Sequence, residues 1–460
     1  MKRKLFRIFI AMTMAVLLLA GCTTPAAPTQ EPAPEATADA AVPAEGAPAI
    51  PVIPETTIRI VQEPYYVCSA ASIGIEKGWY KELGISFDPE PYGTVITGED
   101  TTQYLASQKG DMVDQPTVQS MGAIKDLPPI KTFVFNSIFY GSVVLGQPGM
   151  KTVADFKAEG HAHQEAITLA MEQLRGKTFA YDGTASSHSF VTSCLQMANM
   201  GMDDISLSAY GDPEIVSMML TNQIDFCGGM GLNAAQELIN KGMVVIVSAS
   251  DVVETAQASA SSPELRTVFQ VGWTTYDSYI EENYDTILRF SSVVWREARF
   301  INENREEAIS IHLPFMNSIS GSQNTEGDME SAYSVLTPYY SFEDQQRWFE
   351  DPSYPLYYEH AIGAYIQDWV EKGYLAEDEL KVEDVCIAQQ VFEDMKNLKA
   401  QSETNIAAAE QAIAAGAAGE ALTQAQSLLE QARYYLDAYD FLDAEAFSAA
   451  AVAWAEYSNQ

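Results

Sequence analysis

Cysteine, histidine and basic side chains are scarce in this 460-residue sequence, which contains five Cys and five His. No two cysteines have CxxC spacing, and no GxSxG, HExxH or Walker motif occurs. These patterns place nucleophiles, zinc ligands and phosphate-binding loops in many enzymes. We therefore predict that the protein is not an enzyme and that it holds neither a metal ion nor a cofactor.

Positive charge is equally scarce, because 26 Lys and Arg stand against 63 Asp and Glu, a formal net charge of −37. Without the four basic residues that precede position 8, 22 Lys and Arg remain and the charge becomes −41. A surface with this charge repels nucleic acid and anionic lipid headgroups. We therefore expect no nucleic-acid partner.

A long apolar run, from Phe9 to Ala20, follows the short basic segment at the N-terminus. About a dozen residues are too few to span a bilayer comfortably, but this order is typical of an export signal. The run ends in Leu19-Ala20-Gly21-Cys22, which resembles the lipobox of bacterial lipoproteins. The resemblance implies a signal peptide over residues 1–22 and a lipid anchor on Cys22, on the extracytoplasmic side of the cell membrane, periplasmic or cell-surface.

Residues 23–56 are rich in Ala, Pro, Glu and Thr and contain few side chains that could form a core. This composition predicts a disordered, extended tether. The remaining chain of about 400 residues is long enough for two cores and an appendage. Because a chain of this length needs no covalent cross-link, we expect buried thiols rather than disulfides at its four cysteines. These are Cys68, Cys194, Cys227 and Cys386.

After the tether, short β-branched or aromatic runs alternate with helix-period segments, which is typical of α/β folds. Strands are predicted over residues 57–61, 85–87, 112–114, 131–135, 178–181, 243–247 and 268–274. Helices are predicted over 69–83, 101–110, 117–125, 187–200, 284–303, 326–336 and 358–372. This order favours one lobe made of the first and third parts of the chain, with the middle part inserted as a second lobe.

Four phrases resemble the substrate-binding proteins of ABC importers for nitrate, sulfonates, taurine and thiamine-pyrimidine precursors. The most recognisable phrase is ASIGIEKGWYKELGI at 71–85. The others are QKGDM at 108–112, KTVADF at 151–156 and NQIDF at 222–226. The chain departs from the family pattern where about eighteen residues separate Phe156 from Arg175, and where Asn222 replaces a glycine.

The resemblance covers roughly residues 58 to 375 and implies a two-lobed type II periplasmic-binding fold with a hinge. It also implies an ABC permease in the membrane as the partner. We expect residues 57–145 and 248–400 to form lobe 1 and residues 146–247 to form lobe 2. In such folds the ligand lies between the lobes, at the carboxyl ends of the strands.

In the second lobe, a predicted strand runs through Gly183 into a helix start that is rich in hydroxyl groups. Free N–H groups at a helix N-terminus favour a negatively charged group, and hydroxyls add donors. We therefore predict a small oxyanion or a sulfonate as the ligand, bound by Thr184, Ser186, Ser187 and His188. Ordinary helix capping accounts for the same residue types without any ligand.

Further ligand contacts are expected at other strand ends and turns. The candidates are Tyr65, Tyr66, Ser69, Gln115, Thr117, Gly228 and Gly229. Tyrosine offers a flat apolar face and a hydroxyl, so the alternative ligand is a planar heterocycle such as a thiamine-type pyrimidine or a flavin. Neighbouring tyrosines in a strand point in opposite directions, so only one is expected to reach the ligand.

Residues 401–460 are Ala-rich, and Gly416 and Gly419 break an apolar pattern with helical spacing. We expect an α-helical hairpin here. It either caps the chain's own domain or contacts a second copy or another protein. The second possibility corresponds to a different class of function, a sensory or scaffolding lipoprotein.

Overall fold

The computed structural model describes residues 46–96, 100–121 and 129–460. The expected signal peptide, the anchor residue Cys22 and most of the expected tether lie outside these residues. No helix within the described ranges is both long and apolar enough to cross a membrane.

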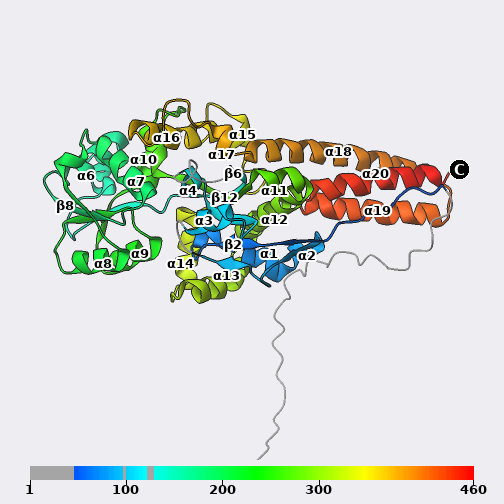
Figure 1. Ribbon diagram of the computed structural model, residues 1–460, viewed down its shortest axis with the longest axis horizontal. Helices are drawn as coiled ribbons and strands as arrows, with labels where there is room; N and C mark the ends of the chain where they lie inside the picture. The colour runs from blue at the N-terminus through cyan, green and yellow to red at the C-terminus, as the bar shows by residue number, and fades with distance from the viewer. Residues whose placement is uncertain (1–45, 97–99, 122–128) are drawn as a thin grey trace, which may run out of the picture. The chain divides into compact units, whose positions relative to one another are not determined.

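Strands and helices alternate from residue 56 to residue 276, and the elements after residue 276 are helices (Figure 1). The strands are β1 Thr56–Ile58, β2 Ile60–Gln62, β3 Ile85–Phe87, β4 Thr94–Val95, β5 Met112–Pro116, β6 Ile130–Phe139, β7 Val143–Gly146, β8 Thr178–Tyr181, β9 Ser206–Ala209, β10 Phe226–Gly228, β11 Val244–Ser248 and β12 Phe269–Tyr276. The helices up to the middle of the chain are α1 Ala71–Lys77, α2 Trp79–Glu82, α3 Asp100–Ala106, α4 Thr117–Met121, α5 Val153–Ala158, α6 His163–Glu172, α7 Ala185–Gln196, α8 Asp212–Leu220, α9 Leu232–Asn240 and α10 Ala249–Val253. The later helices are α11 Asp277–Glu282, α12 Tyr284–Glu303, α13 Arg305–Ser320, α14 Glu326–Ser331, α15 Gln346–Glu350, α16 Tyr358–Glu371, α17 Val382–Val385, α18 Ala388–Ala415, α19 Glu420–Asp437 and α20 Phe441–Tyr457.

Two five-stranded sheets define two lobes with the same strand order. The first sheet has the order β4-β2-β5-β12-β6, and the second has the order β9-β8-β10-β7-β11. β12 runs antiparallel to β5 and β6, and β7 runs antiparallel to β10 and β11. Each of these antiparallel strands is the first one after the chain crosses from the other lobe. The lobes are therefore linked by two chain crossings, as a hinge requires.

The first crossing follows β6 and occupies residues 140–142. Because β7 pairs with β10 and β11, Val143–Gly146 belongs to the second sheet, a few residues before the expected boundary between lobes. The chain returns to the first lobe between β11 and β12. The two-lobed α/β organisation predicted from the alternating pattern is thereby confirmed.

Several predicted elements match the structure, and others differ for local reasons. The strand at 178–181 and the helix at 284–303 have the predicted bounds. The predicted helix at 69–83 is instead divided, because Gly78 adopts a left-handed conformation with φ of 77°. Residues 122–125, the end of another predicted helix, lie outside the described ranges.

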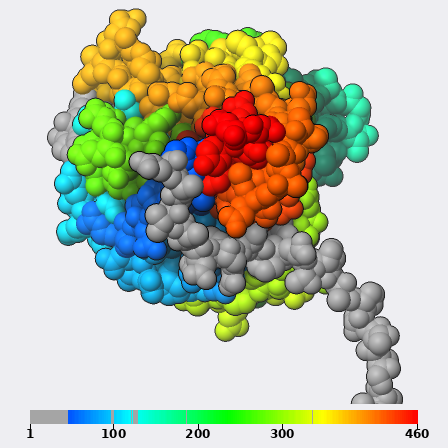
Figure 2. Space-filling view, turned by 90° about the vertical axis from the view of Figure 1, so that its right-hand side faces the viewer, coloured from blue at the N-terminus to red at the C-terminus, as the bar shows by residue number. Residues whose placement is uncertain are grey.

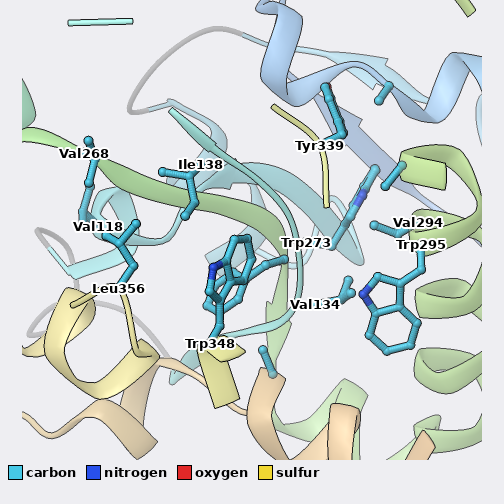
Figure 3. Packing of buried hydrophobic residues seen from close by; sticks show 14 of the residues in the cluster. Val118, Val134, Ile138, Val268, Trp273, Val294, Trp295, Tyr339, Trp348 and Leu356 are labelled. Carbon is cyan, nitrogen blue, oxygen red and sulfur yellow. The ribbon is translucent and has the colours of Figure 1, made fainter. Parts of the chain in front are cut away.

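Large aromatic side chains fill the core of the first lobe (Figure 3). Trp273 of β12, Trp295 of α12 and Trp348 of α15 are at most 1 % exposed. Trp273 contacts the ring of Phe290 edge-on at 4.7 Å between centroids. Most residues of α12 are buried, because α12 packs against β6 of the sheet and against α1, α13 and α20.

The C-terminal appendage contains three helices rather than a hairpin alone. α18, α19 and α20 run side by side (Figure 1), and α20 lies beside the other two when this end of the protein faces the viewer (Figure 2). α19 and α20 form the predicted hairpin, with the break between α18 and α19 at residues 416–419. Buried small residues such as Ala409, Ala432 and Ala451 allow these helices to approach closely. The helical unit therefore begins at Ala388, inside the region assigned to lobe 1 from the sequence.

Candidate ligand-binding site

A cavity of about 630 Å³ is bordered by residues of both lobes. The first lobe contributes the turn after β2, the ends of β6 and β12, and residues of α3, α4, α13 and α16. The second lobe contributes the N-terminal ends of α7, α8 and α9. This volume lies within the range of small-molecule pockets, and its position at strand ends is the usual one for open α/β sheets.

Glu63 forms part of the first-lobe wall, directly after β2. Its side chain is 1 % exposed, and its Oε1 accepts hydrogen bonds from Gln119 Nε2 at 3.0 Å and from Thr101 Oγ1 at 2.9 Å. Burial raises the pKa of the Glu63 carboxyl to about 7, although both hydrogen bonds act in the opposite direction. Neither donor carries a charge, so no cation on these side chains compensates the ionised form of Glu63.

Tyr65 and Tyr66 both line the cavity. Tyr65 is 44 % exposed, whereas Tyr66 is 5 % exposed. The two residues begin a 3₁₀ turn, Tyr66–Cys68, so the alternation of side chains along a strand does not apply to them. Both rings can therefore border the same space.

Asp182 and Thr184 organise the second-lobe wall at the start of α7. Asp182 Oδ1 accepts hydrogen bonds from Thr184 N at 2.8 Å and Thr184 Oγ1 at 2.9 Å. Thr184 Oγ1 also accepts from Ser187 N at 3.3 Å, as an N-cap residue does. The N–H and hydroxyl groups of Thr184, which the sequence predicts as donors to an anion, therefore already donate to the carboxylate of Asp182.

Asp212 is the first residue of α8 and carries a third carboxyl group into the cavity wall. Its Oδ2 accepts from Gly231 N at 3.1 Å, at the start of α9. Its Oδ1 is buried and has no hydrogen-bond partner within the described part of the chain. Burial, and then the charge of Asp182, raise the pKa of this carboxyl. Among the described residues that line the cavity, none is Lys, Arg or His.

Comparison with known proteins gave no matching family model and no matching curated relative. Solved structures do match. The periplasmic aliphatic sulphonate binding protein SsuA from Escherichia coli is 14 % identical with a TM-score of 0.50, covering 72 % of this chain and 91 % of that one. A putative periplasmic sulfonate-binding protein SsuA from Methylobacillus flagellatus is 13 % identical with a TM-score of 0.51, covering 76 % and 96 %.

The nitrate-binding protein NrtA from Synechocystis is 16 % identical with a TM-score of 0.46, covering 76 % of this chain and 89 % of that one. The chain has the type II periplasmic-binding fold. The fold predicted from the four sequence phrases is confirmed by the matches to the two sulfonate-binding proteins, and the appendage of α18 to α20 adds three helices after the two lobes of this fold.

Within this periplasmic-binding fold, five of the predicted site residues border the cavity. They are Tyr65, Tyr66, Thr184, Ser186 and Ser187. All five come from two short segments, one after β2 and one after β8, and the ends of strands are where ligand contacts are expected in this kind of fold. Their contact with a ligand stays a prediction.

Three other predicted residues are buried behind the first-lobe wall and take part in structural hydrogen bonds. Ser69 Oγ lies 2.7 Å from His312 Nε2. Gln115 Oε1 accepts from Thr101 Oγ1 at 3.1 Å. Thr117 Oγ1 accepts from Thr132 Oγ1 at 3.2 Å. The sequence assigned them to the ligand because they lie near strand ends, but each side chain is turned into the protein.

The remaining predicted residues lie beside the cavity. His188 is half-buried next to Tyr181, with ring centroids 6.0 Å apart, and burial followed by the charge of Lys372 lowers its pKa. Gly228 is the last residue of β10 and Gly229 follows it; both are buried, and they precede the cavity-lining Met230. A Cβ at Gly229 would lie 2.8 Å from Ser187 Cβ, so this glycine allows the turn to approach α7.

The residues that the sequence did not predict include the two acidic groups of the second lobe and several apolar side chains. Asp182 and Asp212 each follow a strand by a few residues, so the rule of strand ends could have found them. Trp369 of α16 and Met316 of α13 come from distant parts of the chain, and no local pattern marks them. Only the packing of late helices against the cleft brings them to the cavity.

Proposed function

We propose that this protein is the extracytoplasmic solute-binding component of an ABC importer. It captures one small ligand between its two lobes and presents the closed form to a membrane permease. Cys22 carries the lipid anchor and residues 23–56 act as the tether. The observation that carries the proposal is the 630 Å³ cavity bordered by both lobes, in a fold with two chain crossings.

The ligand is a planar heterocycle rather than a small oxyanion. Aromatic rings of Tyr65, Phe139 and Trp369 border the cavity and suit a flat, partly apolar molecule. A nitrate-sized ion would occupy only a small part of a volume of this size. The carboxyl groups of the cavity wall and the pairing of Thr184 with Asp182 also disfavour a negatively charged ligand.

The lobes already contact each other at Asp368 and at the cavity-lining Asn233, and these contacts limit the direction of closure. Ser189 Oγ of α7 donates to Asp368 Oδ2 of α16 at 2.6 Å, and Arg266 Nη1 donates to Asp368 Oδ1 at 3.2 Å. Asn233 of α9 donates to Ser322 Oγ at 3.3 Å. Closure about the buried Asp368 cluster is expected to move the exposed contact at Asn233 more than the buried one.

A screen by thermal shift tests the proposal on the chain that begins at Thr23. The compounds are nitrate, alkylsulfonates, taurine, bicarbonate, carboxylates, thiamine precursors and riboflavin. A ligand at a hundred times its dissociation constant adds about 2.7 kcal/mol, which moves Tm by some degrees. Small-angle scattering with the best compound should show a smaller radius of gyration, and an unchanged radius at saturation argues against hinge closure.

A further inference from the structure

Three acidic residues from both sides of the cleft line the cavity. Glu63 belongs to the first lobe, and Asp182 and Asp212 belong to the second. The phenol of Tyr65 lies within the electrostatic range of all three. Burial, followed by the charge of Glu63 and smaller effects of Cys68, Asp212 and Asp182, raises its pKa to about 12. Carboxyl groups of both lobes and the half-exposed ring of Tyr65 therefore line the same cavity.

These carboxyl groups have no positively charged partner among the described residues that line the cavity. Glu63 is 1 % exposed, and its two hydrogen-bond donors among the described residues, Thr101 and Gln119, are neutral. Asp212 Oδ1 is buried without a hydrogen-bond partner in the described ranges. Burying carboxylates without a counter-charge is unfavourable, and the described lining residues contain no cationic side chain. A positively charged ligand supplies the missing charge.

Helix N-termini also point toward this wall, and they favour negative charge. The protein itself satisfies that preference, because Asp182 accepts from Thr184 N and Asp212 accepts from Gly231 N. A further anion would meet the acidic side chains at short range. The helix starts therefore hold the acidic groups in place rather than receive an anionic ligand.

Aromatic side chains supply the second half of a cation site. Tyr65 and Trp369 line the cavity, and Phe139 stacks on Phe269 with ring centroids 4.9 Å apart. Faces of such rings attract a cation within about 6 Å, and they also bury the apolar part of an organic ligand. Carboxylates together with aromatic faces are a combination that suits an organic ammonium or a protonated heterocycle.

We propose that the ligand is an organic cation, whose positive charge pairs with Glu63, Asp182 and Asp212 and whose flat body contacts Tyr65 and Trp369. This inference rests on the proposed function, because it names the ligand class of the same cavity. It also predicts that closure of the lobes brings the carboxyl groups of both lobes close to the same positive charge of the ligand.

Two sets of compounds, each with one aromatic body and three different end groups, test whether the cavity prefers a positively charged ligand. One set is 2-phenylethylammonium, 2-phenylethanol and 2-phenylethanesulfonate, and the other is tryptamine, tryptophol and indole-3-ethanesulfonate. Isothermal titration calorimetry with the full chain in detergent should give at least tenfold tighter binding of each ammonium than of its neutral counterpart. Equal or tighter binding of a neutral compound or a sulfonate overturns the proposal, and so does the absence of ammonium binding at the solubility limit.

Variants test whether the acidic residues of the cavity cause the preference for an ammonium compound. Asp212→Asn should weaken ammonium binding by roughly tenfold to a thousandfold, as loss of one partner of a buried charge pair does, and should leave the neutral probe nearly unaffected. Glu237→Gln removes one charge from the exposed face of α9, outside the cavity, and should change neither value. If Asp212→Asn fails to fold by circular dichroism, Asp182→Asn takes its place. If a folded cavity variant keeps the parent's ratio of ammonium affinity to neutral-probe affinity, the assignment of that carboxyl group to the ligand's charge is contradicted.

Scattering separates this inference from the proposed function. A sulfonate that binds and decreases the radius of gyration would refute the cationic ligand and leave the solute-binding function intact. An ammonium compound that binds without any change in radius would support the charge assignment and argue against hinge closure.

Discussion

Arg289 of α12 and Asp443 of α20 form a buried two-point ion pair, with Nε to Oδ2 and Nη2 to Oδ1 both at 2.8 Å. Arg289 is 7 % and Asp443 is 3 % exposed. The pair joins the C-terminal helical unit to the long central helix of the first lobe. The helical unit is thus packed on the chain's own domain along this face, as expected for a cap.

Loss of one partner should be strongly destabilising. Asp443→Asn removes the carboxylate that accepts both hydrogen bonds of the buried Arg289 guanidinium and leaves the charges of Asp440 and Asp285 nearby, so we expect a loss of up to about 3 to 5 kcal/mol in the free energy of unfolding. Glu410→Gln is the matched control, because the Glu410 to Arg433 pair lies half-exposed on the helical unit, and its loss should cost under about 1 kcal/mol. Urea denaturation measures both, and equal effects of the two variants would refute a structural role for the buried pair.

Gly229 should be sensitive to a single added methyl group. It has φ of 56°, and a Cβ there would lie 2.8 Å from Ser187 Cβ. Gly229→Ala should therefore cost about 2 kcal/mol or more and displace the start of α7 from the cavity. Gly201→Ala, also in the second lobe, meets nothing within 4 Å and has no positive φ, so it should be neutral or slightly stabilising. Denaturation that shows no difference between the two variants would contradict this prediction.

Glu63 should make the ligand-free protein less stable as pH rises. Its folded pKa of about 7 lies above the ordinary value of 4.5, so the unfolded chain loses this proton first. Stability is therefore fully present below pH 4.5 and decreases through pH 7, by about 3 kcal/mol for this group. Glu63→Gln should remove this part of the pH dependence and be more stable than the parent at pH 8, whereas Glu237→Gln should follow the parent curve. Parallel curves for the parent and Glu63→Gln between pH 4.5 and pH 8 would contradict the assigned pKa.

The four cysteines of the folded region should be unreactive in the native protein. Cys68, Cys194, Cys227 and Cys386 are buried and free, and burial raises the pKa of each thiol. Ellman's reagent should label the chain from Thr23 slowly in buffer and should count four thiols in guanidinium. A reducing agent should leave Tm unchanged. Fewer than four thiols under denaturing conditions would indicate a disulfide.

Much of the fold could be predicted because local patterns are strong where one residue type dominates. The strand at 178–181 and the helix at 284–303 are predicted by the residue pattern with the bounds that the structure shows. The helix at 69–83 was predicted without its break, although Gly78 was visible in the sequence, since glycine is also tolerated within helices. The start of α18 was missed because its first turns are not Ala-rich and resemble the segments before them.

The candidate site was predicted only in part, for a geometric reason. A strand end indicates which backbone positions reach the cleft, but not which side chains turn toward it. Gln115 and Thr117 occupy such positions, yet their side chains form hydrogen bonds inside the first lobe. The residue types at the start of α7 predict an anion site, whereas the structure shows that Asp182 already accepts hydrogen bonds from Thr184 there, a pairing that the residue types alone do not reveal.

The sequence by itself determined the alternation of strands and helices, the two-lobed fold, the burial of the cysteines and the strand ends that border the cleft. These follow from periodicity, composition and short phrases, all of which act over neighbouring residues. Only the tertiary structure decided the charge of the cavity, because its three carboxyl groups come from different segments and both lobes. The docking of α20 on α12 through Asp443 and Arg289 was likewise decided by packing, since residues 154 positions apart share no local signal.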